Sequence, residues 1–262
     1  MTAILIALLL GLIEGISEFL PISSTGHLLI AEHWLGARSE LFNIVIQAGA
    51  ILAVVLIYRQ RLWQLLTGLG KVENRDYAFK LAAAFAVTAV LGLVVKKLGF
   101  TLPTAVTPVA WALILGALWM LIAERFAERG VPSAKITWTV ALLVGLAQVV
   151  AGVFPGTSRS AATIFIAMLA GTRDRVAATE FAFLVGIPTM FAASAYEVLK
   201  LDHSGGREDL TALAVAFATA TITAFIAVKW LLGYIQTHRF TAFAIYRIAL
   251  GVALLWFLPA GS

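Results

Sequence analysis

The chain has 262 residues, of which 61% are hydrophobic and only 13% are charged. Soluble domains carry about 25% charged residues, so this composition excludes an ordinary water-soluble fold and predicts an integral membrane domain. The formal net charge of +5 is small and dispersed, which argues against a nucleic-acid partner, and the lack of cysteine excludes disulfides and thiolate metal sites.

The first apolar region, residues 3–35, is interrupted near its middle by the polar stretch "EGISEFLPISSTGH". Proline lacks the N–H that continues a helix, so Pro21 predicts two half-helices joined by a loop. Irregular backbone at membrane depth survives only where protein or a water-filled cavity surrounds it. We therefore expect a re-entrant helix-loop-helix pair here.

Six uninterrupted apolar segments approach or exceed the roughly 20 residues that a helix needs to cross a ~30 Å bilayer core. They are residues 41–58, 77–95, 105–123, 176–199, 210–235 and 240–258. The polar stretch "KVENRD" between the first two is expected to be a solvated loop. The predicted fold is an all-α polytopic membrane protein with six transmembrane helices, in which the lipid bilayer is itself a partner.

A second interrupted region, residues 136–170, breaks at "PGTSRS". Placing Pro21 on Pro155 lays "GLIEGISEFLPISST" over "GLAQVVAGVFPGTSR", so that Gly11, Leu12 and Ser24 match Gly145, Leu146 and Ser158. The single domain 1–262 then divides into repeat halves of roughly 1–123 and 134–258. An odd number of spans separates the two re-entrant pairs, which predicts an inverted-topology repeat with a site near the midplane.

Lys and Arg are unequally divided between the two sides of this topology. One side carries Arg59, Arg61, Lys71, Arg75, Lys80, Arg125, Arg129, Lys135, Arg173, Arg175 and Arg239; the other carries Arg38, Lys96, Lys97, Lys200 and Arg207. Because cytoplasmic loops are enriched in Lys and Arg, the first side is expected to be cytoplasmic.

Glu14 and Glu18 are four residues apart, so on a helix they share one face. A carboxylate at the bilayer centre costs roughly 2.5–3.5 kcal/mol, and residues 1–37 contain no Lys or Arg to offset it. Either one carboxyl is protonated or a cation joins the pair, and hard divalent ions prefer oxygen ligands. A solvated pair at the membrane interface is the structural alternative.

Ser23, Ser24 and Thr25 follow Pro21 and precede His27. Hydroxyls at a helix start cap its free N–H groups, and the same N–H groups can bind phosphate. Ser24 and His27 are three residues apart, so His27 could accept a proton from Ser24 or attack directly. A neutral histidine packed in the core is the alternative.

In the second break, Arg159 offers a planar fork that suits phosphate oxygens. The alternative is an ion pair with an acidic residue of the first half, and the two roles are compatible if substrate displaces the pair. Among the weaker candidates, Gln148 occupies the repeat position of Glu14, and Arg247 after Tyr246 needs a carboxylate such as Glu180 or a water-filled lining. Asn43 and Gln47 are expected to hydrogen-bond between helices.

The motifs "EGISEFLPISSTGH" and "PGTSRS", with "FNIVIQAGAILAVV", "EFAFLVGIP" and "FAIYR" in this order, resemble the undecaprenyl-diphosphate phosphatase family, also called bacitracin-resistance proteins. The resemblance covers essentially the whole chain. It implies an enzyme of the bacterial inner membrane, with its active site open to the periplasm. This enzyme hydrolyses the C55 isoprenoid diphosphate and so recycles the lipid carrier of peptidoglycan synthesis.

Carried over residue by residue, the resemblance places a catalytic role on Glu14, Glu18, Ser24, His27 and Arg159. It implies phosphate binding by Ser23, Thr25, Ser158 and Arg159, and a divalent cation, Mg²⁺ or Ca²⁺, held by Glu14 and Glu18. The attacking group is open between His27, Ser24 and water, with His27 slightly favoured. A transporter or lipid flippase is the alternative function, and a homodimer is one of the oligomeric states left open.

Overall fold

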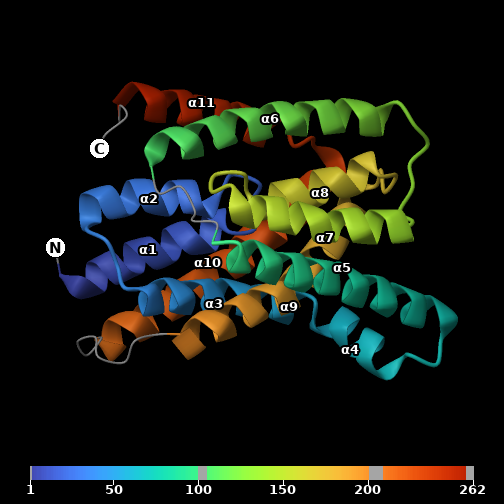
Figure 1. Cartoon of the computed structure of the whole chain (residues 1–262), viewed down its shortest axis with the longest axis horizontal. Coiled ribbons are helices and arrows are strands. Elements are labelled where there is room, and N and C mark those ends of the chain that lie inside the picture. Colours follow the sequence, from blue (N-terminus) through green and yellow to red (C-terminus); the bar gives the residue numbers. More distant parts are fainter. Residues whose placement is uncertain (1, 100–104, 201–208, 258–262) are drawn as a thin grey trace.

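Every regular element among residues 2–99, 105–200 and 209–257, the part of the chain that this computed structural model describes, is an α-helix. Figure 1 shows the axes of the long helices roughly aligned with one another, as in a bundle that crosses a bilayer. The all-α prediction is confirmed.

Five of the described helices are long and apolar enough to cross a membrane. They are α3 (Glu40–Ile57), α5 (Val72–Lys97), α6 (Val106–Glu128), α9 (Arg175–Lys200) and α10 (Leu210–Thr237). Large apolar side chains cover their outer faces; Ile222 and Ile226 of α10, for example, are 60% and 63% exposed. Apolar exposure of this extent suits lipid rather than water, so the chain is a multi-pass membrane protein.

The sixth predicted span is shorter than expected. It corresponds to α11 (Thr241–Phe257), which has 17 residues, and Leu258 lies outside the described residues. At about 1.5 Å per residue this helix is roughly 25 Å long, less than a typical hydrocarbon core. Length and composition therefore identify five spans rather than six.

The expected solvated loop after residue 58 is also partly helical. Residues 59–67 form the short helix α4 (Arg59–Thr67), and α5 begins at Val72 inside the polar stretch "KVENRD". An ion pair between Asp76 and Lys80, one turn apart, supports this polar first part of α5.

Both interrupted regions form helical hairpins. The first consists of α1 (Ala3–Ser17) and α2 (Ser24–Leu35), the second of α7 (Trp138–Val153) and α8 (Arg159–Leu169). The two helices of each pair contact each other and lie side by side in Figure 1. We call the connecting residues 18–23 the first loop and residues 154–158 the second loop.

Each loop ends in a serine with an unusual backbone conformation. Ser23 has φ 74° and Ser158 has φ 68°, the only non-glycine residues with positive φ in the described chain. Each hydroxyl accepts a hydrogen bond from the N–H three residues ahead, at Gly26 and Ala161, both at 3.3 Å. The backbone thus equates Ser23, not Ser24, with Ser158, one residue away from the register that the prolines predicted.

The packing of the two hairpins is alike. Helix α1 of the first hairpin packs on α10, and helix α7 of the second hairpin packs on α5. Helix α3 also contacts α9, and α6 contacts α11. A Cβ atom on Gly11 of α1 would lie 2.5 Å from the carbonyl oxygen of Ala216, and one on Gly145 of α7 would lie 2.6 Å from that of Ala84. Glycine at these matched positions therefore lets each hairpin approach its partner helix closely.

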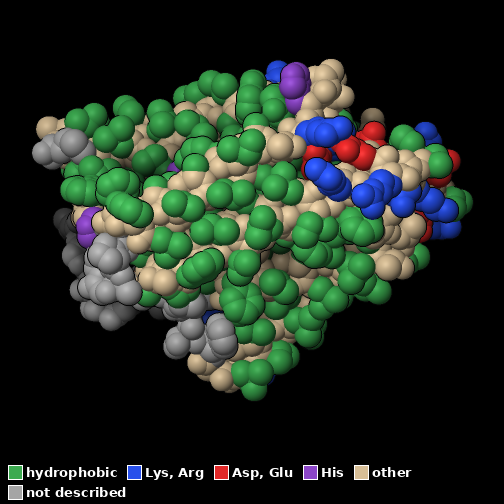
Figure 2. Space-filling model, turned by 90° about the horizontal axis from the view of Figure 1, so that it is seen from above, with side chains coloured by type: hydrophobic (Ala, Val, Ile, Leu, Met, Phe, Trp, Pro, Cys, Tyr) green, Lys and Arg blue, Asp and Glu red, His purple; other side chains and the backbone are tan. Residues whose placement is uncertain are grey.

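Charged side chains gather at one end of the bundle, as Figure 2 shows for one face. Ion pairs at this end join Arg175 to Glu124 at 2.7 Å and Arg239 to Glu128 at 2.5 Å. The remainder of the visible face is mostly apolar. Arg207, expected at the opposite end, lies outside the described residues.

Candidate active site

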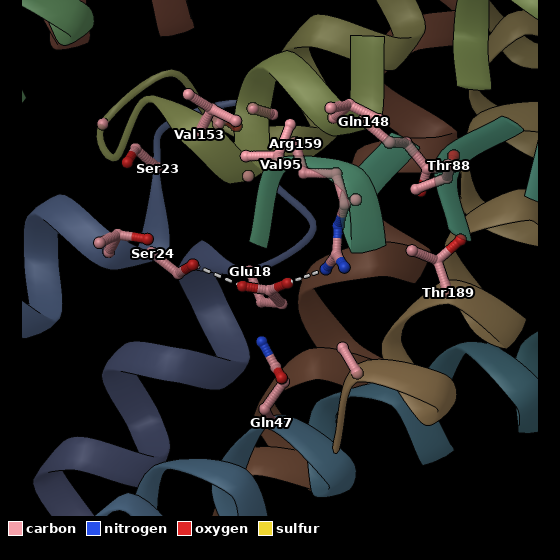
Figure 3. A pocket seen from close by; sticks show the side chains of 18 of the residues that line it. Glu18, Ser23, Ser24, Gln47, Thr88, Val95, Gln148, Val153, Arg159 and Thr189 are labelled. Atoms are coloured by element: carbon pink, nitrogen blue, oxygen red, sulfur yellow. Dashed lines mark hydrogen bonds and ion pairs between the residues drawn. The ribbon is translucent and has the colours of Figure 1, made fainter. Parts of the chain in front are cut away.

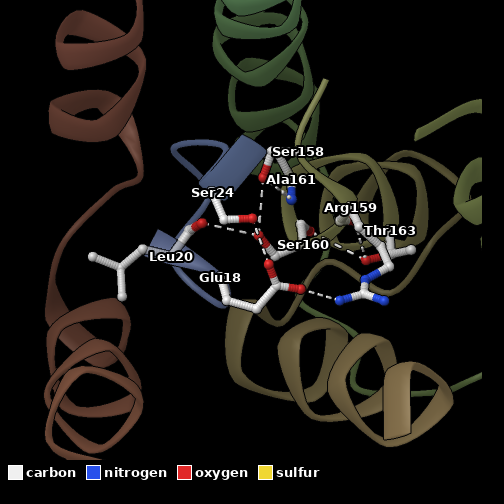
Figure 4. A network of polar contacts seen from close by, with 8 residues as sticks. All are labelled: Glu18, Leu20, Ser24, Ser158, Arg159, Ser160, Ala161 and Thr163. Atoms are coloured by element: carbon white, nitrogen blue, oxygen red, sulfur yellow. Dashed lines mark hydrogen bonds and ion pairs between the residues drawn. The ribbon is translucent and has the colours of Figure 1, made fainter. Parts of the chain in front are cut away.

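The centre of the site is the carboxylate of Glu18, directly after the last residue of α1. Its Oε1 accepts a hydrogen bond from Nη2 of Arg159, the first residue of α8, and its Oε2 accepts one from Oγ of Ser24, the first residue of α2 (Figure 4). The two hairpins therefore meet, and a carboxylate of one faces a guanidinium of the other, as the sequence predicted. Glu18 is buried, with 8% of its surface exposed.

A second polar contact joins the loops next to this ion pair. Ser160 Oγ donates to the carbonyl oxygen of Leu20 at 3.0 Å and lies 3.0 Å from Ser158 Oγ. Ser160 belongs to α8 and Leu20 to the first loop, so this contact holds the start of α8 against the loop (Figure 4).

The ion pair and Ser24 border a cavity of about 450 Å³. Glu18, Ser23, Ser24, Thr25, Ser158 and Arg159, all predicted site residues, line it. Figure 3 shows Glu18 and Ser24 from the first hairpin and Arg159 from the second around the same space. The hydroxyls of Ser23 and Ser158 accept hydrogen bonds from their own helices, whereas Thr25 is exposed.

Other helices complete the cavity with side chains that the sequence did not single out. Thr88 and Lys96 come from α5 and Thr189 from α9. Gln47 of α3, predicted to bond between helices, lines the cavity instead, and Figure 3 shows it below Glu18. The sequence could have indicated Thr88 and Gln47 as cavity residues, because each is a polar residue inside an otherwise apolar run.

Gln148 also lines the cavity and is anchored by Thr88. Its Nε2 donates to Thr88 Oγ1 at 2.9 Å, and Thr88 Oγ1 donates to the carbonyl oxygen of Gly145 at 3.0 Å. Gln148 thus supports the second hairpin, as its repeat position opposite Glu14 suggested.

Glu14 lies one turn before Glu18 on α1, where the N–H of Glu18 donates to its carbonyl oxygen at 2.9 Å. It is 2% exposed, and its Oε2 has no hydrogen-bond partner in the described chain. A solvated pair at the interface is therefore excluded. An unpaired buried carboxylate oxygen is costly and is the type of group that a cation or a proton stabilises.

His27 is held away from Ser24. Its Nε2 lies 2.6 Å from the hydroxyl of Tyr246, its Nδ1 lies 2.7 Å from the carbonyl oxygen of Ser23, and its ring stacks on that of Tyr246. His27 is not among the described residues that line the cavity. Ser24 donates to Glu18 instead, so the expected proton transfer from Ser24 to His27 lacks a contact in this structure.

Arg247 is fully buried, but Glu180 is not its partner. Glu180 pairs with Arg61 at 3.3 Å and lies 3.5 Å from the hydroxyl of Tyr77. Arg247 instead donates to main-chain carbonyls, including that of Pro21 in the first loop and that of Thr157 in the second. Long-range carbonyl acceptors leave no sequence signal, which is why this arrangement was not predicted.

The donor set limits how a divalent cation could bind. In the described residues no group of three or more His, Cys, Asp or Glu side chains has the geometry of a metal site. Glu14 and Glu18 alone cannot enclose a cation, so water and substrate phosphates would have to supply the remaining oxygen ligands of Mg²⁺ or Ca²⁺. Mg²⁺ in particular is usually held by one or two carboxylates in this way.

Comparison with known proteins gives the same family along nearly the whole chain. The family model described as "Bacitracin resistance protein BacA" matches residues 7–253. A protein of Rhizobium etli (strain CIAT 652) named undecaprenyl-diphosphatase is 68% identical over 257 residues, 97% of each chain. One of Xanthomonas euvesicatoria pv. vesicatoria (strain 85-10) with the same name is 63% identical over 264 residues, 100% of each chain.

Proposed function

The chain belongs to the bacitracin resistance protein BacA family, and from this membership and the geometry of the site we propose that it is an undecaprenyl-diphosphatase. It hydrolyses the C55 isoprenoid diphosphate to the monophosphate and inorganic phosphate, recycling the lipid carrier of peptidoglycan synthesis and conferring bacitracin resistance. One observation carries the proposal: Glu18 accepts hydrogen bonds from both Ser24 and Arg159 beside a cavity between two loops.

Phosphate binding is assigned to Arg159 and the N-terminus of α8. Substrate phosphate competes with Glu18 for the guanidinium, and a bidentate guanidinium–phosphate contact is strong. Ser158 Oγ accepts from the N–H of Ala161, which leaves the N–H groups of Arg159 and Ser160 at the start of α8 as a suitable place for an anion. Thr25, exposed and lining the cavity, is placed to donate to the same oxygens.

Ser24 is the attacking group that the geometry favours, because it lies beside the cavity and already donates to a carboxylate. Its Oγ attacks the terminal phosphorus, its proton passes to Glu18, and the bond to the bridging oxygen breaks to release the lipid monophosphate. Water then displaces Ser24 from phosphorus, Glu18 returns the proton to Oγ, and inorganic phosphate leaves.

Glu14 and Glu18 are the residues that would hold a divalent cation, and the unpaired Oε2 of Glu14 supports this assignment. When bound, Mg²⁺ would neutralise negative charge on the diphosphate. Chelation by EDTA is therefore expected to lower activity.

The complete topology in this proposal has six membrane-crossing helices, counting α11, and two re-entrant hairpins related as inverted repeats. The matched packing of α1 on α10 and of α7 on α5 supports the repeat. The clustering of basic residues at one end supports a cytoplasmic location for that end in a bacterial inner membrane. Val95 and Lys96, at the far end of α5, line the cavity, which supports an opening to the periplasm.

Phosphate release from undecaprenyl diphosphate by purified protein in detergent, with and without EDTA, tests the proposal. Glu18→Gln and Arg159→Ala are expected to remove most of the release without preventing folding. An inactive but folded parent protein would contradict it.

A transporter or lipid flippase is the second candidate, since paired interrupted helices are typical of transporters. A flippase moves lipid only across a sealed bilayer and releases no phosphate in detergent, so the same assay separates the two functions. A homodimer is retained as a proposal for the oligomeric state, which light scattering in detergent would measure.

A further inference from the structure

Arg247, in the middle of α11, is a buried cation that the proposed mechanism does not use. It is 0% exposed, and none of the ion pairs in the described residues involves it. Burying a charged group is expensive unless its hydrogen bonds are satisfied. The surroundings of this guanidinium should therefore explain why it is retained.

All the hydrogen-bond acceptors of Arg247 are main-chain carbonyls. The donor–acceptor distances are 3.2 Å from Nε to Leu113, 3.1 Å from Nη2 to Ala112, 3.1 Å from Nη2 to Gly156, 3.0 Å from Nη1 to Thr157 and 3.4 Å from Nη1 to Pro21. A guanidinium has five N–H donors in a rigid planar fork. Arg247 thus has one carbonyl for each donor, an arrangement that lysine with three donors cannot reproduce.

These carbonyls belong to three separate segments of the chain. Ala112 and Leu113 lie in α6, Pro21 lies in the first loop, and Gly156 and Thr157 lie in the second loop. One rigid group on α11 therefore connects both loops to each other and to a long helix. In the part of the chain that the structure describes, Ser160–Leu20 and Arg159–Glu18 also join the first loop to the start of α8, and both contacts are part of the site itself.

The contact with Thr157 also affects the phosphate-facing backbone. In a trans peptide the C=O and the next N–H point in opposite directions. Since the carbonyl of Thr157 points at Arg247, the N–H of Ser158 points away from it. Ser158 lines the cavity and directly precedes Arg159, so this contact sets the direction of the helix start that faces substrate.

We propose that Arg247 is a positioning residue for diphosphate hydrolysis: by holding the carbonyls of both loops it fixes Arg159 and the start of α8 opposite Glu18 and Ser24. This inference rests on the proposed function. Arg247 touches no reacting atom itself. Misplacement of catalytic groups by about 1 Å can cost on the order of 100-fold in rate, which is the size of effect expected on loss of the fork.

The first test is Arg247→Lys, which keeps the charge and removes the fork. For folded, monodisperse protein we expect kcat for phosphate release to fall by about 100-fold, with a much smaller change in KM because Arg247 itself does not line the cavity. The matched control is Arg175→Lys, which alters an ion pair with Glu124 at the charged end. It should leave kcat per folded molecule unchanged even if it lowers the unfolding temperature.

A second variant leaves residue 247 as arginine and changes a neighbouring residue instead. A Cβ atom on Gly116 of α6 would lie 2.2 Å from Nη2 and 3.0 Å from Cζ of Arg247, so Gly116→Ala should push the guanidinium away from its carbonyls while favouring the helix. We expect a smaller loss of kcat than in Arg247→Lys, and kcat is again compared per folded molecule because displacing a buried guanidinium also costs stability.

Arg247→Lys decides the question if it folds, and Gly116→Ala decides it if Arg247→Lys cannot be purified. The inference would be overturned if the variant that folds has the same kcat as the parent protein. It would also be overturned if the loss of kcat equals the fraction of unfolded protein in the sample. An inactive parent would instead overturn the proposed function, so the two failures are distinguishable.

Discussion

At the level of single residues, the ion pair between Glu18 and Arg159 joins the two hairpins at the centre of the site. A polar side chain inside an apolar membrane segment costs free energy, so the polar clusters beside the two proline breaks indicated a common functional site. The partners of His27 and Arg247 were not predicted. His27 contacts Tyr246, which lies 219 residues away, and no periodicity in a single sequence encodes such a contact.

Covalent trapping tests the role of Ser24. Because Ser24 donates to Glu18 beside the cavity, acid quenching under single turnover is expected to yield an acid-stable phosphoserine at position 24. Mass spectrometry of the quenched protein identifies the site, with Ser24→Ala as the control that should give no adduct. An acid-labile adduct on His27 would restore the histidine mechanism, and the absence of any adduct would favour water.

Removal of the Glu14 carboxylate tests the cation site. Oε2 of Glu14 has no partner to lose, so Glu14→Gln should fold normally. It should raise the Mg²⁺ concentration needed for half-maximal activity by about 10-fold or more, a typical cost of perturbing a metal site. Activity measured against buffered free Mg²⁺ gives this value, and an unchanged Mg²⁺ dependence would remove Glu14 from the cation site.

At the level of helices, the two interrupted hairpins were predicted because proline and clustered hydroxyls are strong local signals. The register set by the prolines holds for Gly11 and Gly145 in the helices but is wrong by one residue at the caps, because backbone conformation aligns Ser23 rather than Ser24 with Ser158. Helix α4 and the start of α5 were missed, since a polar, charged run resembles a loop when only hydrophobicity is considered.

Close packing of the hairpins gives a stability prediction. A Cβ atom on Gly145 would lie 2.6 Å from the carbonyl oxygen of Ala84, so Gly145→Ala should destabilise the protein by about 1–3 kcal/mol. Thermal unfolding in detergent measures the change. The matched control is Gly233→Ala on α10, where no atom lies within 4 Å of the added Cβ; equal effects of the two would contradict the packing argument.

Two exposed glycines beside the cavity, Gly92 of α5 and Gly152 of α7, give a prediction about substrate length. Both line the cavity, and a Cβ atom added to either would have no other atom within 4 Å, so we expect the lipid chain to leave the cavity beside them. Gly92→Leu should therefore lower kcat/KM for the C55 diphosphate more than for a short prenyl diphosphate. An equal loss for both substrates would show that the lipid chain leaves the cavity elsewhere.

At the level of the whole molecule, composition was sufficient to predict an all-helical membrane domain, and the described helices confirm it. What composition could not provide is the meeting of two loops that are more than a hundred residues apart. Their contact depends on Ser160 with Leu20, on Arg159 with Glu18 and on the carbonyls held by Arg247, all of which arise only when both halves are packed.

A double-mutant cycle on phosphate release tests this meeting most directly. If Glu18 and Arg159 act in one pocket, the loss of kcat/KM in the double variant Glu18→Gln with Arg159→Ala should be close to the larger of the two single losses. Glu18→Gln combined with Arg175→Lys serves as the control and should show independent effects. Losses that multiply for the Glu18 and Arg159 pair would mean that the two loops act separately, which would contradict the account.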